Sequence, residues 1–318
     1  MGSIPLTADS SSKISAIVHT RNSEATVEIT LSSLLWADEI VVVDMARVDN
    51  TVEIARRFTQ RIISIPEYPR VDGIRNRYLE VAEYEWILVL DSDEFLAADA
   101  PEALRGLIES KGAKFDAFAL PRYNTIAGQI MPTGPWYPDH QIRLFRKNTV
   151  RWPDSIHVLP EVVTGRHRLC ELTPPDCPHI HHRNYSSLQD FILRQVEYAL
   201  HDDYDADPRS FDFSATIARA YEALAFCDDR ENGGDLSHAL SLVMAWDAII
   251  RGLIHWERLD KKPSLGLLAA LPVATGRVPW WKVTFRRWFW RRHSLRFALR
   301  RIAYILRGYA WKLGWRRN

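Results

Sequence analysis

Two carboxylates separated by one residue follow an apolar run in the first third of the chain. Asp91 and Asp93 come directly after the run 86–90, with Ser92 between them and Glu94 behind them. Carboxylate oxygens are the ligands that Mg²⁺ and Mn²⁺ prefer, and these cations commonly bridge to substrate phosphates. A solvated acidic turn would give the same letters, but the apolar strand before the pair favours a site. The spacing therefore predicts a Mg²⁺ or Mn²⁺ site at Asp91 and Asp93.

Other polar residues could serve a reaction at the same place. Asp44 ends a second apolar run, where it could accept hydrogen bonds from a ribose or a base edge, although a strand-end turn is the alternative. Arg75 and Asn76 lie on the expected helix before Asp91, within reach of a base or a diphosphate; for Arg75 a surface salt bridge is the competing interpretation.

A positioned carboxylate can act as a general base that takes the proton from an attacking hydroxyl. Asp139 is the first candidate, because Trp136 and Tyr137 beside it could stack on a sugar. A turn at Pro138 and Asp139 would explain the same letters. Glu161 is the second candidate for the base.

The elements that must position these residues alternate in type along the first third. Near-continuous apolar runs joined by helical patterns predict a parallel sheet covered on both faces. The carboxyl ends of its strands form one edge, and ligands bind there in sheets of this kind. The expected strands are 14–18, 39–44, 61–65 and 86–90, and the expected helices are 24–36, 50–59 and 72–83.

The rest of the chain changes character after about residue 115. Strands are expected at 115–121 and 141–146, and a helical period dominates afterwards. The expected helices lie near 187–201, 213–228, 236–256 and 280–313. The fold class is therefore α/β, with a mostly parallel central sheet followed by a helical C-terminal region.

The motifs in residues 14–200 resemble those of family 2 inverting glycosyltransferases, especially the lipopolysaccharide-core glucosyltransferase branch. The sequence departs from the family at Met45, at Arg47 and at Val158, where the family has a Glu; Glu161 lies three residues later. The resemblance is carried by ADEIVVVD at 37–44, Arg75-Asn76, WILVLDSDE at 86–94, WYPDHQIRLFR at 136–146 and His182-Arg-Asn-Tyr-Ser186.

The resemblance implies a GT-A-like fold that binds a nucleotide diphosphate sugar, with a UDP-sugar favoured, as donor. It also implies a divalent cation, for which His182 would be a third ligand or a contact to the diphosphate. The residues expected at the donor are Thr20, Asn22, Glu24, Asp44, Arg75, Asn76, Asp91 and Ser92. The acceptor would be a lipid-linked or cell-envelope glycan.

Charge is distributed unevenly. The chain has 41 Lys/Arg and 40 Asp/Glu, yet 13 of the basic residues lie in 276–318, which contain no acidic residue; the first 275 residues thus hold 28 basic against 40 acidic, a net of −12. The segment 276–318 also holds six of the 12 Trp. Amphipathic helices rich in Arg and Trp suit the headgroup layer of an anionic membrane. A core-packed helical cap is the alternative, and the acidic body argues against nucleic acid.

These features give a domain plan and a location. We expect a flexible N-terminus at 1–12, a transferase domain at 13–186, a helical region at 187–275 and membrane-associating helices at 276–318. Three cysteines and no apolar leader predict a cytoplasmic protein. The basic segment 276–318 predicts that it is peripheral on the inner face of the cell membrane. A zinc site at Cys170, Cys177 and the following histidines fits poorly. The rival functions are a sugar nucleotidyltransferase and a non-catalytic membrane-surface protein on a decayed transferase domain.

Overall fold

The structure is a computed structural model that describes residues 12–45, 48–67, 71–153, 160–175, 177–201 and 213–258. The expectations for the N-terminus, for Arg47 and Val158, and for the basic segment 276–318 lie outside these residues.

A seven-stranded sheet forms the centre of the domain, in the order β12-β6-β9-β4-β1-β2-β3. Strands β1, β2, β3 and β4 are parallel, as the sequence predicts, while β9 runs antiparallel between β4 and β6. The fold class is confirmed as α/β. The strands are β1 (Ile14–Thr20), β2 (Glu39–Asp44), β3 (Ile62–Ser64), β4 (Trp86–Asp91), β6 (Ala117–Leu120), β9 (Gln141–Arg146) and β12 (Leu169–Glu171).

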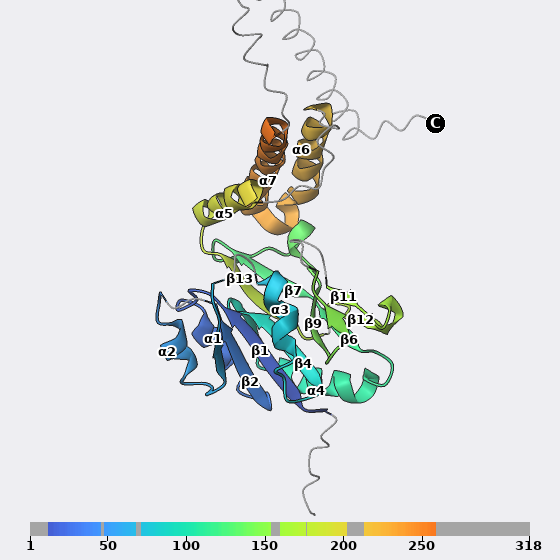
Figure 1. Ribbon diagram of the computed structural model, residues 1–318. Helices are drawn as coiled ribbons and strands as arrows, with labels where there is room; N and C mark the ends of the chain where they lie inside the picture. The colour runs from blue at the N-terminus through green and yellow to red at the C-terminus, as the bar shows by residue number, and fades with distance from the viewer. Residues whose placement is uncertain are drawn as a thin grey trace, which may run out of the picture. The chain divides into compact units, whose positions relative to one another are not determined.

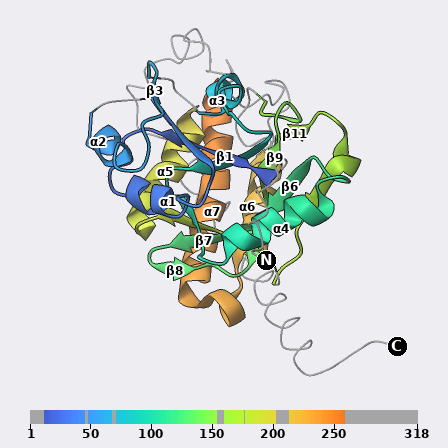
Figure 2. The ribbon, with the colours of Figure 1, turned by 90° about the horizontal axis from the view of Figure 1, so that it is seen from below.

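Helices cover both faces of this sheet (Figures 1 and 2). One face packs Leu31, Ala55 and Leu104 of α1 (Val27–Ser32), α2 (Thr51–Ala55) and α4 (Ala100–Lys111) into the first core cluster. The other face buries Leu79 of α3 (Asp72–Leu79). Burial on both faces explains why β1, β2 and β4 read as unbroken apolar runs.

The helix expected at 24–36 is shorter in the structure. After Ser32 the chain turns, with Leu34 N donating to Leu31 O and Ala37 N donating to Leu34 O. Asp38 N then donates to Ile14 O, which starts the pairing of β2 with β1. The turn into the sheet therefore takes residues that the 3.6-residue period assigns to the helix.

A second, four-stranded sheet was not expected from the sequence. Its order is β5-β13-β7-β8, and its strands are β5 (Glu94–Leu96), β7 (Arg122–Ile126), β8 (Gln129–Ile130) and β13 (Ile180–Tyr185). A short hairpin joins β10 (Val150–Arg151) to β11 (Glu161–Val162). Because β5 begins three residues after the end of β4, the second sheet starts at the carboxyl edge of the first.

Three helices follow the sheets, close to their expected positions: α5 (Leu188–His201), α6 (Phe213–Cys227) and α7 (Arg230–Arg258). Helix α7 begins earlier than expected and is interrupted at Gly234, whose φ of 60° lies in the left-handed region. Phe191 of α5 and Leu240 of α7 pack with Ile126 and Tyr185 of the second sheet in a third core cluster. The helices are thereby anchored to the second sheet.

Candidate active site

Three strands of the central sheet end at the same edge with polar side chains. Register pairs Thr20 with Asp44 and His19 with Asp91 across β1, β2 and β4. Thr20 Oγ1 donates to Asp44 Oδ1 at 2.9 Å, and both residues are buried. The expected convergence of strand-end residues is thus present.

Asp91 lies between two buried arginines. Arg75 Nη2 donates to its Oδ1 at 2.7 Å, and Arg143 Nη2 donates to its Oδ2 at 2.5 Å. Burial alone would raise the pKa of Asp91, but Arg143 and Arg75 hold it well below its usual range. Arg75 therefore forms a buried ion pair with Asp91 and not a surface salt bridge. Arg143, which lies in the motif at 136–146, was not predicted as a site residue.

His19 lies beside this group, on the strand next to Asp91. Burial, followed by the charge of Arg75, lowers the pKa of His19 to about 3, so its ring is neutral. Neither ring nitrogen has a hydrogen-bond partner in the part of the chain that the structure describes. Because the His19 ring is neutral, it places no further positive charge beside Arg75 and Arg143.

A chain of ion pairs continues from Asp91 to the candidate base. Arg143 Nη2 also donates to Glu94 Oε1 at 2.8 Å, and Arg122 Nη1 donates to the same oxygen at 2.6 Å. Arg122 Nε and Nη2 donate to Asp139 Oδ2 at 2.8 and 2.6 Å. Asp139 is therefore joined to Asp91 through Arg122, Glu94 and Arg143.

The carboxylate of Asp139 is held in one orientation. Asn124 Nδ2 donates to Oδ2 at 2.9 Å, and Gln141 Nε2 donates to Oδ1 at 2.7 Å. Burial opposes ionisation, but Arg122, Asn124 and Gln141 lower the pKa of Asp139. The group is an anion at neutral pH, and Oδ1 keeps capacity to accept a further hydrogen bond.

His182 lies between Asn124 and Asp93. Asn124 Nδ2 also donates to Trp136 O at 2.8 Å, so its Oδ1 is the acceptor that faces His182 Nδ1 at 2.7 Å. On its other side His182 Nε2 lies 3.5 Å from Asp93 Oδ2. A neutral ring that donates from Nδ1 to Asn124 would turn its Nε2 lone pair toward Asp93, whereas a protonated ring would form an ion pair with it. With a neutral ring, His182 Nε2 and Asp93 Oδ2 would offer two acceptors to a cation.

This donor set fits a divalent cation with few protein ligands. An imidazole that donates its other nitrogen to an amide oxygen is typical of metal-binding histidines. Among the described residues no group of three or more His, Cys, Asp or Glu is arranged to hold a metal. A cation bound by Asp93 and His182 would therefore complete its coordination with water and substrate oxygens, as Mg²⁺ commonly does. Asp91 is engaged by arginines in this structure.

The loop after β1 forms hydrogen bonds with the loop after β4, which contains Ser92, and with the loop after β2. Ser23 Oγ and Ser92 Oγ lie 2.7 Å apart, and Asn50 N and Nδ2 both donate to Glu24 Oε2 at 3.0 Å. Asn22 is exposed and has a φ of 49°. Ser92 and Glu24 thus have partners that fix the loops, and Ser23 is a connecting residue that sequence reasoning missed.

The side-chain amide of Asn76 forms two hydrogen bonds with the backbone of Trp152. Its Nδ2 donates to Trp152 O at 2.7 Å, and Trp152 N donates to its Oδ1 at 2.8 Å. The guanidinium of Arg75 lies 5.3 Å from the Trp152 ring centroid. Asn76 and Trp152 therefore position Arg75.

Glu161 lies apart from the series of ion pairs that joins Asp91 to Asp139, the carboxylate–arginine chain. It is exposed in β11, opposite Arg151 of β10, and no hydrogen bond to another described residue is formed by its side chain. Of the two aromatic residues beside Asp139, Trp136 packs edge-on against Phe191 with centroids 5.6 Å apart, while Tyr137 stacks on Tyr123 at 4.9 Å. The geometry favours Asp139 over Glu161.

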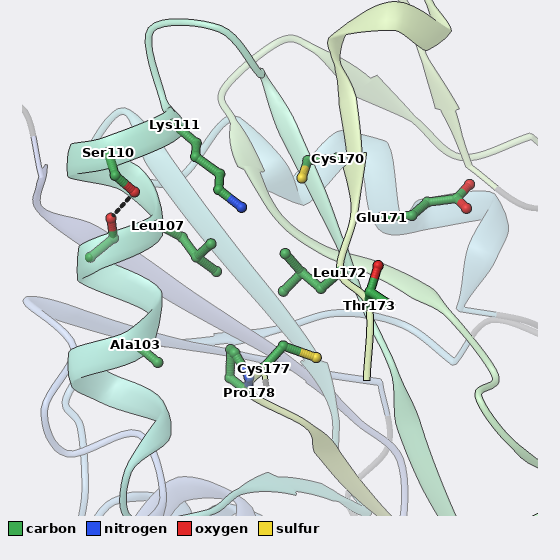
Figure 3. Close-up of a pocket in the computed structure, with 11 residues that line it drawn as sticks. Ala103, Leu107, Ser110, Lys111, Cys170, Glu171, Leu172, Thr173, Cys177 and Pro178 are labelled. Carbon is green, nitrogen blue, oxygen red and sulfur yellow. Dashed lines mark hydrogen bonds between the residues drawn. The ribbon is translucent and has the colours of Figure 1, made fainter. Parts of the chain in front are cut away.

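A separate pocket of about 410 Å³ lies between α4 and β12 (Figure 3). Leu107, Lys111, Cys170, Leu172 and Cys177 are among its lining residues. None of its lining residues belongs to the carboxylate–arginine chain. The described residues also hold no zinc-like cluster at these cysteines.

Comparison with known proteins identifies the domain that carries these strand ends. Residues 15–168 match the model of the family described as Glycosyl transferase family 2. An uncharacterized glycosyltransferase of Rickettsia bellii is 31% identical over 100 residues, which cover 31% of this chain and 34% of that protein. A TPR repeat-containing protein of Synechococcus elongatus is 33% identical over 93 residues, or 29% of this chain and 23% of that protein. The matches thus span about a third or less of these curated relatives.

Among solved structures, S. aureus TarS 1-349 in complex with UDP-GlcNAc is 17% identical and covers 80% of this chain and 92% of that one, with a TM-score of 0.44. Residues 15–168 thus carry a domain of the glycosyl transferase family 2 type.

Proposed function

We propose that this protein transfers a hexose, with inversion, from a nucleotide diphosphate sugar to a lipid-linked or cell-envelope glycan acceptor, and that the donor is a UDP-sugar. The observation that carries the proposal is the chain of ion pairs from Asp91 to Asp139 at the carboxyl edge of the sheet. It joins cations suited to a diphosphate to an anion suited to a hydroxyl. Family membership gives the reaction class.

The donor would lie along the ends of β1, β2 and β4. Thr20 and Asp44 stand where a nucleoside would be bound, with Asn22, Glu24 and Ser92 in the loops that shape this end. Arg75 and Arg143 supply buried positive charge for the diphosphate, since guanidinium groups pair well with phosphate oxygens. Asp91 holds both guanidinium groups in place until the donor arrives.

A bound Mg²⁺ or Mn²⁺ would supply positive charge to the leaving diphosphate. Asp93 and His182 are the residues that would hold it, and a neutral His182 that donates from Nδ1 to Asn124 would have Nε2 able to coordinate. Asp91 is a weaker candidate ligand, because both of its oxygens accept hydrogen bonds from arginines.

Asp139 would accept the proton of the acceptor hydroxyl as that oxygen attacks the anomeric carbon. Oδ1 is the oxygen with capacity for this proton, while Arg122 and Asn124 hold Oδ2. Tyr137 and Tyr123, stacked beside Asp139, offer an aromatic surface for an acceptor sugar.

The location follows from the charge pattern in the sequence. We propose a cytoplasmic protein that is peripheral on the inner membrane face, bound there through the basic segment 276–318. Electrostatic binding of this segment predicts that high salt releases part of the protein from anionic vesicles.

The experiment that tests the proposed function is a thermal-denaturation panel with UDP, GDP and ADP, each with and without Mn²⁺. Specific binding raises the melting temperature by mass action, so UDP with Mn²⁺ should give the largest increase. UDP-glucose and UDP-N-acetylglucosamine are then assayed for release of UDP with lipid extracts as acceptor. Absence of any nucleotide-dependent increase would refute the proposal.

A further inference from the structure

Helices α6 and α7 form an antiparallel hairpin (Figure 1). At one end Phe213 of α6 lies against Trp256 of α7, with ring centroids 6.0 Å apart. At the other end Ser237 Oγ donates to Cys227 O at 2.7 Å. The two helices therefore run side by side along the whole of α6.

Small and polar side chains fill the seam between the two helices. A Cβ on Gly252 would lie 2.4 Å from Thr216 Cγ2, so the backbones approach closely at this point. Asp247 and Arg251 form a largely buried ion pair at 2.7 Å. The buried residues of the hairpin include Thr216, Ala220, Ser237, Ser241, Ala245 and Gly252.

Large apolar side chains face outward instead. On α7, Leu242, Trp246, Ile249, Leu253 and Trp256 are 39–52% exposed and recur every three or four residues. This spacing places them in one stripe along the helix. On α6, Phe213, Ile217 and Tyr221 are 51–64% exposed at a spacing of four residues.

Apart from the α7 side chains that pack on the second sheet, such as Leu240, the hairpin thus differs from a helix pair in water. A water-soluble pair buries its apolar stripes against each other and exposes polar residues. Small residues at the helix–helix contact are typical of helices that pack in lipid. Residues 230–257 are also apolar enough, and form a long enough helix, to cross a membrane by length and composition alone. In the most apolar 18-residue stretch of this helix, 33% is buried. The paired charges of Asp247 and Arg251 within α7, and Arg219 and Glu222 exposed on α6, favour a position at the interface over a crossing.

We propose that the outward apolar face of the α6–α7 hairpin lies in the interfacial layer of an anionic lipid bilayer. Trp246, Trp256 and Tyr221 are the aromatic types that prefer this layer. The chain continues from α7 into a segment whose residues 276–318 hold 13 Lys/Arg, six Trp and no acidic residue. These cations complement anionic headgroups, and they follow α7 in the same chain. The inference does not depend on the proposed transferase activity.

Contact of the apolar stripe with lipid contributes a binding free energy that salt does not screen. The expected electrostatic attraction of 276–318 weakens as the ionic strength rises, because salt screens exposed charges. Burial of the apolar stripe in the interface is not screened. Two membrane contacts of different physical origin can therefore be separated by experiment.

The test uses the full chain and vesicles of phosphatidylcholine with phosphatidylglycerol, at low and at high salt. The variant Ile249→Ser/Leu253→Ser removes two side chains of the stripe, and Leu35→Ser/Val163→Ser is the matched control, because Leu35 and Val163 are 63% and 52% exposed in the sheet domain. In cosedimentation at high salt the stripe variant should partition about tenfold more weakly than the wild type, from the loss of two partly buried side chains. The control should partition like the wild type.

Hydrogen exchange measured over 240–257 in the wild type keeps the test independent of the variant's folding. Vesicles should slow exchange in this segment. Three results would overturn the proposal: equal partitioning of the stripe variant and the wild type, equal exchange with and without vesicles because the chain's own C-terminal segment covers the stripe, or a dimer in solution that the stripe variant dissociates without any change in vesicle binding.

Discussion

Asp91 and Asp93 are expected to respond differently to the same substitution, Asp to Asn. Asp93→Asn removes the anion that faces His182 Nε2 at 3.5 Å. Asp91→Asn removes the anion that Arg75 and Arg143 share. The side chains of Asp91 and Asp93 are both 31% exposed, so solvent exposure does not explain a difference between them.

The expected change in the free energy of unfolding depends on which charged groups lose their partner when each carboxylate is replaced. The arginine side chains at Asp91 are 3% and 4% exposed, and loss of one partner of a buried ion pair costs about 3–5 kcal/mol. Arg143 keeps Glu94, and Asp91 is partly solvated, so we expect about 2–4 kcal/mol for Asp91→Asn. Asp93→Asn should change the free energy of unfolding by less than about 0.5 kcal/mol.

The assay is thermal denaturation with and without UDP and Mn²⁺. Ligand at one hundred times its dissociation constant stabilises by about 2.7 kcal/mol, and Asp93→Asn should lose the part of this increment that depends on Mn²⁺. Asp91→Asn should already melt several degrees lower without ligand. Melting of Asp91→Asn at the wild-type temperature, or a full Mn²⁺-dependent increment in Asp93→Asn, would refute the reasoning.

Three further outcomes can be measured. Asp139→Asn should lower kcat about 10²-fold or more with donor KM nearly unchanged, whereas Glu161→Gln should keep wild-type activity; the reverse result would move the general base to Glu161. Asp116 has a pKa lowered by its hydrogen bond from Arg168, so its stabilisation is present above the unfolded pKa near 4 and is lost as the pH falls through the lower folded pKa. Urea unfolding should therefore show Asp116→Asn less stable than the wild type at pH 7, by about 2 kcal/mol, with the difference shrinking toward pH 3; a constant difference would contradict this. Burial raises the pKa of the Cys227 thiol to about 11, so in the folded protein it should react with a disulfide reagent more slowly than the two partly exposed thiols.

The central sheet was predictable because its strands are buried on both faces. Strand β2, at 39–44, was placed at its observed bounds, since an unbroken apolar run between polar turns has few alternative structures. Strand β9, at 141–146, was also placed at its observed bounds, although Arg143 interrupts its apolar residues. The ends of parallel strands then placed Asp44 and Asp91 at one edge. Helix ends were less predictable, as at α1, where pairing of Asp38 with Ile14 ends the helical period early.

The second sheet could not be predicted from local patterns. Strand β5 has three residues, and β13 contains two adjacent histidines and an arginine, so neither shows an apolar run. Their pairing is long-range: His182 lies opposite Glu94 and Asn124 in the register of the sheet. Arg122 and Asn124, the two β7 residues that hold Asp139, were missed for this reason.

Asn124 also connects the proposed metal ligand His182 to the proposed base Asp139. Its Nδ2 holds Asp139 and Trp136 O, which leaves its Oδ1 to accept from His182 Nδ1. If the ring is neutral, that bond leaves the lone pair on Nε2, which lies 3.5 Å from Asp93 Oδ2. An amide that flipped would lose its bond to Asp139 and would also reverse the acceptor that sets the histidine tautomer. One side chain therefore orients the expected base and the expected metal ligand together, because an amide offers donors on one side and an acceptor on the other.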